Sequence, residues 1–334
     1  MSDLVLILTE CGADIGFGHL TRCLSLADAF QQAGIDSQIL LASDGSAPGQ
    51  LPAPVRPVDW YGLPNGLNLE LSQARALILD SYRVTVEQIH QIAQTNSRLA
   101  VIDDVFRRHP QGRVVIDWTA GADRFAFPEK LPGVCYLLGT HYCAVRPAFQ
   151  TVAERNFPIH PRSLLVTFGA ADPCRLTKPV LAMLRQRFPD CDKAVVLGPA
   201  FCDSSIRQMR ELRTSFHSSI DARQMRTLMT QADIAVCAGG QTLYELASQG
   251  LPPVIVSAIE NQKDDIRGFI NAGFGVDGGS WGRPGFLDVL ASGVQSLWSV
   301  SARKRHSGAG LRCVDGLGAT RLVAALQAQW ESAQ

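Results

Sequence analysis

A histidine stands between two glycines and a predicted helix near the N-terminus. Gly16 and Gly18 precede His19 in the segment DIGFGHLTRCLSLADAF. A glycine loop that joins a buried strand to a helix delivers the next side chain to the carboxyl edge of a parallel sheet, where ligands bind. The positive end of a helix favours a neutral imidazole, which accepts a proton at physiological pH. We therefore interpret His19 as a candidate general base, with packing as the alternative.

A second pair of glycines, in the C-terminal half, has the features of an anion site. Gly239 and Gly240 follow the apolar run 234–237, and Gln241 and Thr242 open a predicted helix. Free amides at a helix N-terminus point toward a ligand, and the helix dipole favours negative charge there. This pattern predicts a bound diphosphate.

Other polar residues fall at predicted strand ends of the same two halves. Glu245 stands three residues after Thr242, so it is either a capping-box glutamate or an acceptor for a ribose diol. Gly169 lies in TFGAADP, a loop that matches the Gly-Gly helix entrance in the same half, and Asn261 and Gln262 follow another strand. In the first half, the acids of LDSY (79–82) and IDD (102–104) either cap helices and hold loops or bind a sugar, with Tyr82 offering a flat face.

Continuous apolar runs separated by helical patterns must position these residues. Such runs are typical of parallel strands that are covered on both faces. We expect strands at 4–9, 37–41, 76–80, 99–103, 114–117, 135–138, 193–197, 234–237 and 253–257, and a strand that runs into a glycine turn within 163–173. A helix follows from Leu20, with Gly34 as its stop, the stretch 43–70 is expected to be loop-rich, and the last helix runs from about 319 to 331.

The alternation predicts an α/β protein with two doubly wound domains, which we expect to face each other across a cleft. We place the first domain, carrying His19, at residues 1–150 and the nucleotide-binding domain at 151–334, with the last helix packing back on the first domain. Residues 146–162 have the proline and charge content of a linker.

Composition argues against several classes of protein. The 31 basic residues balance the 31 acidic ones, so we expect neither a nucleic-acid nor a membrane partner. The N-terminus has an apolar core of only five residues, which indicates a strand and not a signal peptide. Nine scattered cysteines without a C-x-x-C pair argue against a zinc site or a disulfide framework and favour the cytoplasm.

A dinucleotide-binding fingerprint is a poor match. Gly16 and Gly18 fit its first two glycines, but Thr21 stands at the third. The loop from Thr9 to Gly16 is also too long for the tight turn of that motif, so a dehydrogenase is disfavoured.

The motifs GFGHLTRCLSLA, DSY, IDD, FGAADP, AGGQTLYELASQGLP and ENQ occur in this order, with Tyr-x-x-x-Arg-Pro-x-Phe at 142–149. In this set the chain resembles the UDP-sugar hydrolases of pseudaminic acid biosynthesis, which remove UDP from UDP-2,4-diacetamido-2,4,6-trideoxy-β-L-altrose. The resemblance extends over nearly the whole chain, and it implies the fold of the GT-B glycosyltransferases. The family commonly has Thr-Trp-Glu where this chain has Leu243-Tyr244-Glu245.

The resemblance also implies a mechanism: water attacks the anomeric carbon with inversion, and neither a metal nor a cofactor takes part. His19 would activate the water, Glu245 would hold the ribose, and the amides of residues 239–242 would stabilise the leaving diphosphate. Arg146 and Asn261 would line the cleft, and Tyr82 would touch the sugar. The predicted binding residues are Gly16, Gly18, Arg22, Tyr82, Arg146, Gly169, Gly239, Gly240, Gln241, Thr242, Glu245, Asn261 and Gln262.

Two alternatives remain beside hydrolysis. A GT-B glycosyltransferase would use the same histidine and phosphate site, and a nucleotide-sugar sensor would bind without turnover. The loop Asp-Ile-Gly-Phe-Gly-His differs from the Gly-Gly-x-Gly-Gly-His type of lipid-acceptor transferases, which favours the hydrolase. We expect a monomer whose partner is a small-molecule nucleotide sugar.

Overall fold

The computed structural model describes residues 3–12, 15–45, 51–63, 65–105, 114–124, 130–209 and 211–332. The chain forms two compact units, each built on one parallel sheet. Unit 1 comprises Met1–Pro147 with Leu317–Gln334, and unit 2 comprises Ala148–Gly316. The predicted fold class, two doubly wound α/β domains, is confirmed.

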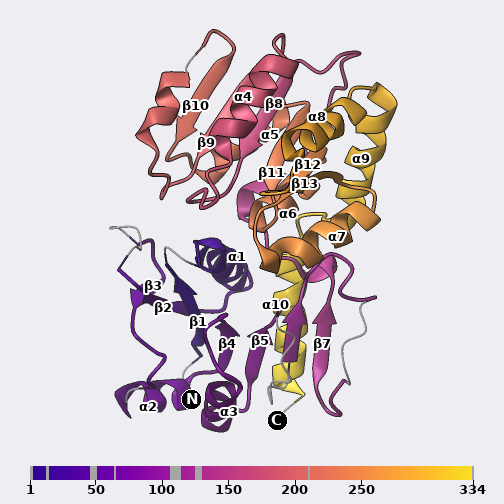
Figure 1. Ribbon diagram of the computed structural model, residues 1–334. Coiled ribbons are helices and arrows are strands. Elements are labelled where there is room, and N and C mark those ends of the chain that lie inside the picture. Colours follow the sequence, from indigo (N-terminus) through magenta and orange to yellow (C-terminus); the bar gives the residue numbers. More distant parts are fainter. Residues whose placement is uncertain are drawn as a thin grey trace. The chain divides into compact units, whose positions relative to one another are not determined.

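The sheet of unit 1 has the order β3-β2-β1-β4-β5-β6-β7 (Figure 1), so the strand order reverses between β1 and β4. Its strands are β1 (Val5–Cys11), β2 (Ser37–Ser43), β3 (Val55–Pro57), β4 (Ala76–Asp80), β5 (Leu99–Ile102), β6 (Val114–Asp117) and β7 (Cys135–Leu138). Its helices are α1 (Gly18–Gln32), α2 (Asn65–Gln73), α3 (Val86–Thr95) and α10 (Gly318–Glu331), with 3-10 turns η1 (Thr140–Tyr142) and η2 (Pro147–Phe149) at its boundary with unit 2.

The central strand β1 is apolar along its length because helices cover both faces of the sheet. All seven of its residues are buried. Leu6 and Leu8 pack into a cluster with α2 and α3, and α1 packs against the same strand. Burying each such leucine contributes about 1.5–3 kcal/mol. The same burial fixes the register of the strand and therefore the place of the residues at its carboxyl end.

The last helix, α10, completes unit 1. Trp330 stacks on Phe30 of α1, with ring centroids 6.1 Å apart. The Arg321 Nε donates a hydrogen bond to the carbonyl of His141 at 2.8 Å. Residues from the far end of the chain thus share a core with the first helix.

The sheet of unit 2 has the order β10-β9-β8-β11-β12-β13, with its reversal between β8 and β11 (Figure 1). Its strands are β8 (Ser163–Thr167), β9 (Asp192–Leu197), β10 (Thr214–Ser218), β11 (Ile234–Ala238), β12 (Pro253–Ser257) and β13 (Val276–Ser280). Its helices are α4 (Thr177–Arg187), α5 (Ala222–Gln231), α6 (Gln241–Ser248), α7 (Lys263–Asn271), α8 (Phe286–Ser296) and α9 (Val300–Cys313), with 3-10 turns η3 (Ser204–Met209) and η4 (Glu260–Gln262).

Two arginines hold the segment 146–162 in place: Arg155, which is half-buried, and Arg303, which is fully buried. Arg155 donates to the carbonyls of Met229, Gln249 and Ala232. Burial lowers the pKa of Arg155 to about 10, although the negative charge of Asp233 raises it. Arg303 donates to the carbonyl of Pro158.

The stretch 43–70 is more ordered than expected, because β3 and the start of α2 lie within it. Strands β3, β10 and β13 were not predicted, and β1 and β2 extend two residues beyond their predicted ends. Among the described helices, none combines the length and the apolar character needed to cross a bilayer.

Candidate functional site

The loop after β1 is closed by a backbone pair between two glycines. The amide of Gly16 donates to the carbonyl of Gly12 at 2.7 Å, and the Gly12 amide donates back at 3.3 Å. Gly16 adopts a φ of +81°, which a glycine tolerates without strain. Helix α1 then begins at Gly18 and has no side-chain cap. His19 is therefore placed in the first turn of the helix, at the carboxyl edge of the sheet.

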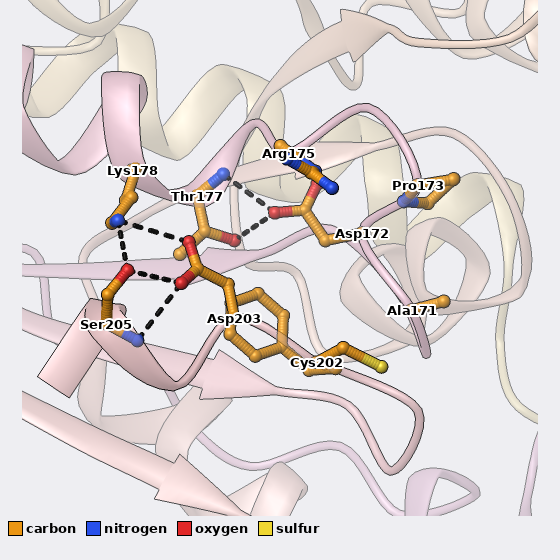
Figure 2. Close-up of a pocket in the computed structure, with 10 residues that line it drawn as sticks. Ala171, Asp172, Pro173, Arg175, Thr177, Lys178, Cys202, Asp203 and Ser205 are labelled. Atoms are coloured by element: carbon orange, nitrogen blue, oxygen red, sulfur yellow. Dashed lines mark hydrogen bonds and ion pairs between the residues drawn. The ribbon is translucent and has the colours of Figure 1, made fainter.

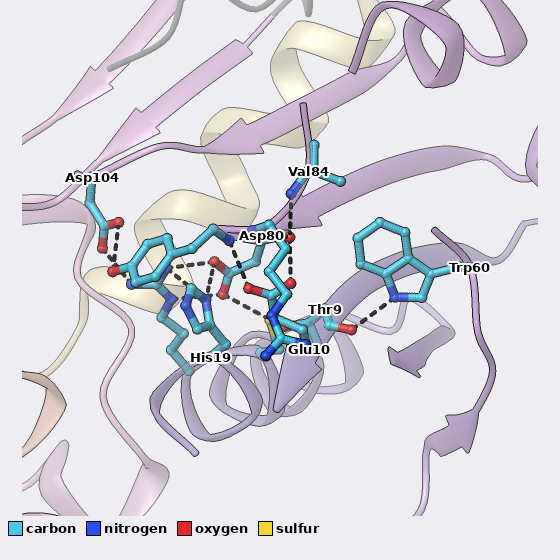
Figure 3. Close-up of polar contacts among 12 residues, drawn as sticks. Thr9, Glu10, His19, Trp60, Asp80, Val84 and Asp104 are labelled. Carbon is cyan, nitrogen blue, oxygen red and sulfur yellow. Dashed lines mark hydrogen bonds and ion pairs between the residues drawn. The ribbon is translucent and has the colours of Figure 1, made fainter. Parts of the chain in front are cut away.

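His19 is held by a carboxylate at the end of the neighbouring strand. Its Nδ1 lies 2.7 Å from Oδ1 of Asp80, the last residue of β4 (Figure 3). His19 is 3% exposed, and Asp80 is fully buried. Among the described residues, no hydrogen bond of His19 uses Nε2. A histidine whose Nδ1–H donates to a carboxylate presents an unprotonated Nε2, which is the arrangement of a general base.

Arg22 stands one helical turn after His19 and shares its face of α1. Its Nε and Nη2 donate to the two oxygens of Asp80 at 2.7 and 2.5 Å. Its Nη1 donates to Oδ2 of Asp104 at 2.5 Å, and its guanidinium lies 5.2 Å from the ring centroid of Trp118. All three guanidinium nitrogens are thus engaged by carboxylates of unit 1.

The charges of this cluster keep Asp80 ionised. Burial raises the pKa of Asp80, but the charge of Arg22 and the hydrogen bonds from Arg22 and His19 outweigh it, so the pKa lies below its usual range. Burial likewise lowers the pKa of Arg22, and the carboxylates of Asp104 and Asp80 reverse this and raise it. The cluster therefore holds a carboxylate and a guanidinium as ions inside the fold.

A second buried carboxylate shapes the loop that carries Tyr82. Glu10 of β1 accepts hydrogen bonds from the Ser81 hydroxyl at 2.5 Å and from the Tyr82 amide at 2.8 Å. It also accepts one from the phenol of Tyr61. The Tyr61 ring borders a cavity of about 730 Å³ at the carboxyl ends of β2 and β3. Glu10 is not among the predicted site residues, although it lies at the end of the first strand, next to the strand that ends in Asp80.

In unit 2, Gly239 and Gly240 join β11 to α6 as predicted. Gly240 has a φ of +112° and is the N-cap of α6, with no side-chain cap. A Cβ on Gly239 would lie 2.8 Å from Cβ of Gln262, so this backbone approaches the next loop closely. Near them, Oε1 of Gln262 is buried and has no hydrogen-bond partner among the described residues.

The position at which α6 begins excludes one of the two interpretations of Glu245. Because α6 begins at Gln241 with Gly240 as N-cap, Thr242 is not the capping residue and Glu245 is not at the third position of the helix. The capping-box alternative is therefore wrong. Glu245 is 1% exposed on this short helix.

The loop that contains Gly169 differs from the Gly239–Gly240 turn, because a buried carboxylate binds the amides at the start of the helix that follows. Gly169 follows β8 with a φ of +81°. The buried Asp172 accepts hydrogen bonds from the amides of Leu176 and Thr177 at 2.8 and 2.9 Å, so it satisfies the start of α4. This loop borders a cavity of about 520 Å³ (Figure 2), in which Lys178 lies 3.2 Å from Asp203.

The predicted site residues thus fall into two groups. In unit 1, the structure brings His19, Arg22 and Tyr82 together after the Gly16–Gly18 turn, and Arg146 lies just before η2. In unit 2, Gly239 and Gly240 adjoin Gln262, and Gln241, Thr242 and Glu245 follow on α6. Asn261 lies in η4 and is exposed, and Gly169 belongs to the β8 loop.

In the structure, Asp80 and Asp104 bind protein side chains, which is a different role from contact with a sugar. From the sequence they are expected to be caps, loop anchors or sugar ligands, whereas in the structure their carboxylates bind His19 and Arg22. The sequence does contain signals for this cluster. The carboxylates of Glu10, Asp80 and Asp104 lie at the ends of adjacent strands, and His19 stands three residues before Arg22.

Comparisons with known proteins give distant relatives. No family model matches the chain. The spore coat polysaccharide biosynthesis protein SpsG of Bacillus subtilis is 29% identical over 198 residues, which is 58% of each chain. The UDP-2,4-diacetamido-2,4,6-trideoxy-β-L-altropyranose hydrolase of Campylobacter jejuni is 20% identical over 82% of this chain and 98% of its own.

A third relative combines two activities in its name. It is the pseudaminic acid cytidylyltransferase and UDP-2,4-diacetamido-2,4,6-trideoxy-β-L-altropyranose hydrolase of Helicobacter pylori, 22% identical over 77% of this chain and 45% of its own. The match with this chain spans about half the length of the first curated relatives, between 45% and 58%.

Solved structures share the fold at low identity. MurG of Acinetobacter baumannii is 12% identical, with a TM-score of 0.62 over 97% of this chain and 99% of its own. The spinosyn rhamnosyltransferase SpnG with thymidine diphosphate has 13% identity and a TM-score of 0.59 over 97% and 99%. MnaA of S. aureus with UDP has 12% identity and a TM-score of 0.63 over 96% of both chains. The chain therefore has a GT-B-like fold.

Proposed function

We propose that this protein is a nucleotide-sugar hydrolase that releases UDP from UDP-2,4-diacetamido-2,4,6-trideoxy-β-L-altrose or a close relative. The observation that carries the proposal is the His19–Asp80 pair, with Nδ1 on the carboxylate and Nε2 unengaged by the described residues. The C. jejuni and H. pylori relatives carry this hydrolase activity in their names. Both matches extend over more than three quarters of this chain.

In this proposal, His19 takes a proton from water as the water oxygen attacks the anomeric carbon from the side opposite to the nucleotide. The C1–O bond breaks, and its electron pair stays on the terminal phosphate oxygen of UDP. The products are the free sugar with inverted configuration and UDP. A positioned base of this kind contributes about 10²–10⁴-fold to the rate.

Unit 2 would bind the nucleotide. The amides of Gly240, Gln241 and Thr242 lie at the start of α6, where Gly240 leaves the helix end without a side-chain cap. Fixed amide dipoles of this kind stabilise a developing phosphate charge. Glu245 would accept hydrogen bonds from the ribose, and Gly169, Asn261 and Gln262 would complete the nucleotide site.

Unit 1 would bind the sugar beside His19. Tyr82 packs edge-on against the imidazole and would contact the sugar ring, while Gly16 and Gly18 leave room for it. Arg146 would bind phosphate or sugar.

The test is UDP release without an acceptor, measured for a panel of UDP-diacetamido sugars in water enriched in ¹⁸O. Hydrolysis as proposed places the label in the sugar and none in UDP, and EDTA leaves the rate unchanged. Release only when an acceptor is added would replace the hydrolase with a glycosyltransferase, the activity of the SpnG neighbour. Firm binding without release in either case would indicate a sensor.

A further inference from the structure

The carboxylate of Asp80 is fully saturated by donors of helix α1. Its Oδ1 lies 2.7 Å from His19 Nδ1 and 2.5 Å from Arg22 Nη2. Its Oδ2 accepts from Arg22 Nε at 2.7 Å and from the Cys23 thiol at 3.3 Å. A carboxylate offers about four lone-pair positions, so no free position remains on Asp80.

Arg22 is itself held from the other side. Its Nη1 donates to Asp104 at 2.5 Å, and the second oxygen of Asp104 accepts from the Tyr82 phenol at 3.3 Å. With 6% exposure and three engaged nitrogens, the guanidinium is occupied within unit 1. A direct contact between Arg22 and substrate would require breaking one of these ion pairs.

We propose that Arg22, anchored by Asp104, is a positioning residue that fixes the Asp80 carboxylate and thereby holds His19 as the Nδ1–H tautomer. The catalytic role of this positioning by Arg22 rests on the hydrolase function proposed above. The unengaged Nε2 is then the basic nitrogen, in a fixed direction.

One contact allows the opposite tautomer, and chemistry decides between the two. Arg22 Nη2 lies 3.1 Å from His19 Nδ1, so a hydrogen bond from arginine to an unprotonated Nδ1 is conceivable. The contact to Asp80 is shorter, and an ionised carboxylate has no proton to donate. Arg22 Nη2 already donates to the same Asp80 oxygen at 2.5 Å. The proton on Nδ1 therefore belongs to the bond with Asp80.

The shape of the guanidinium is essential to this arrangement. Nε and Nη2 form a fork that matches both oxygens of Asp80, while Nη1 points to a second carboxylate. A lysine carries the same charge at one nitrogen and cannot form both contacts in one plane. Among the described residues, the groups that contact His19 are Asp80 of β4, Arg22 of α1 and Tyr82 after β4. Cys23 contacts Asp80, and Asp104 contacts Arg22.

The test is a two-bond ¹H–¹⁵N correlation spectrum of protein with ¹⁵N-labelled histidine, since protonated and bare ring nitrogens differ widely in ¹⁵N shift. The His19 signal is assigned as the one missing in His19→Asn. We expect a single Nδ1–H tautomer in the wild type at neutral pH. In Arg22→Lys and in Asp104→Asn we expect a mixture of tautomers, because the carboxylate is no longer fixed.

Arg56→Lys is the matched control, since Arg56 forms a half-buried ion pair with Glu70 elsewhere in the same unit. It should leave the His19 signal unchanged. A wild-type Nε2–H tautomer, or an unchanged Nδ1–H signal in a folded Asp104→Asn, would overturn the proposal. The spectrum is recorded without substrate turnover, so its result is independent of the UDP-release assay. An inactive wild type that shows the Nδ1–H tautomer would refute only the proposed hydrolase activity.

The kinetic readout separates positioning from substrate binding. If Arg22 acts through Asp80, Asp104→Asn lowers kcat about tenfold or more and leaves KM within about twofold, as loss of a transition-state effect does. A raised KM with unchanged kcat would mean that this cluster binds substrate, and it would overturn the positioning role.

Discussion

The imidazole of His19 and the phenol ring of Tyr82 meet almost at a right angle, with ring centroids 4.2 Å apart and an interplanar angle of 83°. Asp80 holds the same imidazole through Nδ1. Tyr82 is fixed in turn, because its amide donates to Glu10 and its phenol to Asp104. The imidazole is thus constrained both in its hydrogen bond and in the orientation of its ring.

We predict that His19→Asn lowers kcat by about 10² or more while UDP affinity changes little, because only proton transfer in the transition state is lost. Steady-state UDP release and calorimetric UDP binding measure the two quantities. His217→Asn is the control, since His217 is a histidine of β10 in unit 2 that bonds Ser215. Full activity in His19→Asn would remove His19 from the mechanism.

Asp80→Asn should destabilise the protein by about 3–5 kcal/mol at neutral pH, because it leaves the buried Arg22 with one carboxylate in place of two. The measurement is urea unfolding of wild type and variant. Asp192→Asn breaks the exposed pair with Arg213 and should cost about 1 kcal/mol or less. Equal losses in the two variants would contradict the assigned role of the buried ion pair.

The same pair predicts a pH dependence of stability. The folded-state pKa of Asp80 lies below its unfolded value of about 3.9, so its contribution is complete above that pH. The contribution is lost as the pH falls toward the folded-state pKa. The difference in unfolding free energy between wild type and Asp80→Asn should therefore stay constant from pH 7 to about 4 and shrink below it. A difference that grows in acid would refute the lowered pKa.

The central strands could be predicted from the sequence because their residues are buried on both faces. β4, β6 and β12 have the predicted bounds, and so does β7, which lies at a sheet edge but carries the apolar run CYLL. β3, β10 and β13 lie at sheet edges, where one side has no neighbouring strand. β13 reads VDGGS and β10 reads TSFHS, so neither contains the continuous apolar run that identifies a covered strand.

The parts of the site that depend on local sequence spacing could be predicted from the sequence. Gly239 and Gly240 precede a helix start in the sequence, and the helix places their amides without help from distant residues. The bond from His19 to Asp80 joins residues 61 positions apart. It depends on β1 and β4 being neighbours in the sheet, an order that apolar patterning does not reveal. The same strand order brings Asp80 and Asp104 to Arg22.

Glu245→Ala should raise KM for the UDP-sugar with little change in kcat, because in our proposal it removes ground-state contacts to the ribose. Steady-state kinetics and UDP binding measure this. Glu87→Ala on α3 is an exposed control in unit 1. Since the capping-box role is excluded by the start of α6, an unchanged KM would leave Glu245 without a role in nucleotide binding.

The close approach of Gly239 to the loop after β12 makes this glycine sensitive to a single methyl group. Its added Cβ would lie 2.8 Å from Gln262 Cβ and 3.1 Å from Ile266 Cγ1, so Gly239→Ala must displace η4 or α7. Overpacking of this kind costs about 1–3 kcal/mol. At Gly240 the nearest atom is the flexible end of Gln262, 3.8 Å away, and strain would come from the φ of +112°.

We therefore predict that Gly239→Ala destabilises unit 2 by about 1–3 kcal/mol and weakens UDP binding, because the shifted loop carries Asn261 and Gln262. Calorimetric titration with UDP and thermal unfolding measure the two effects. Gly308→Ala on α9 meets only the flexible end of Arg312 at 3.4 Å. It should be neutral or stabilising by up to about 1 kcal/mol, with unchanged UDP affinity. If Gly239→Ala binds UDP as tightly as Gly308→Ala, the nucleotide does not lie at the start of α6.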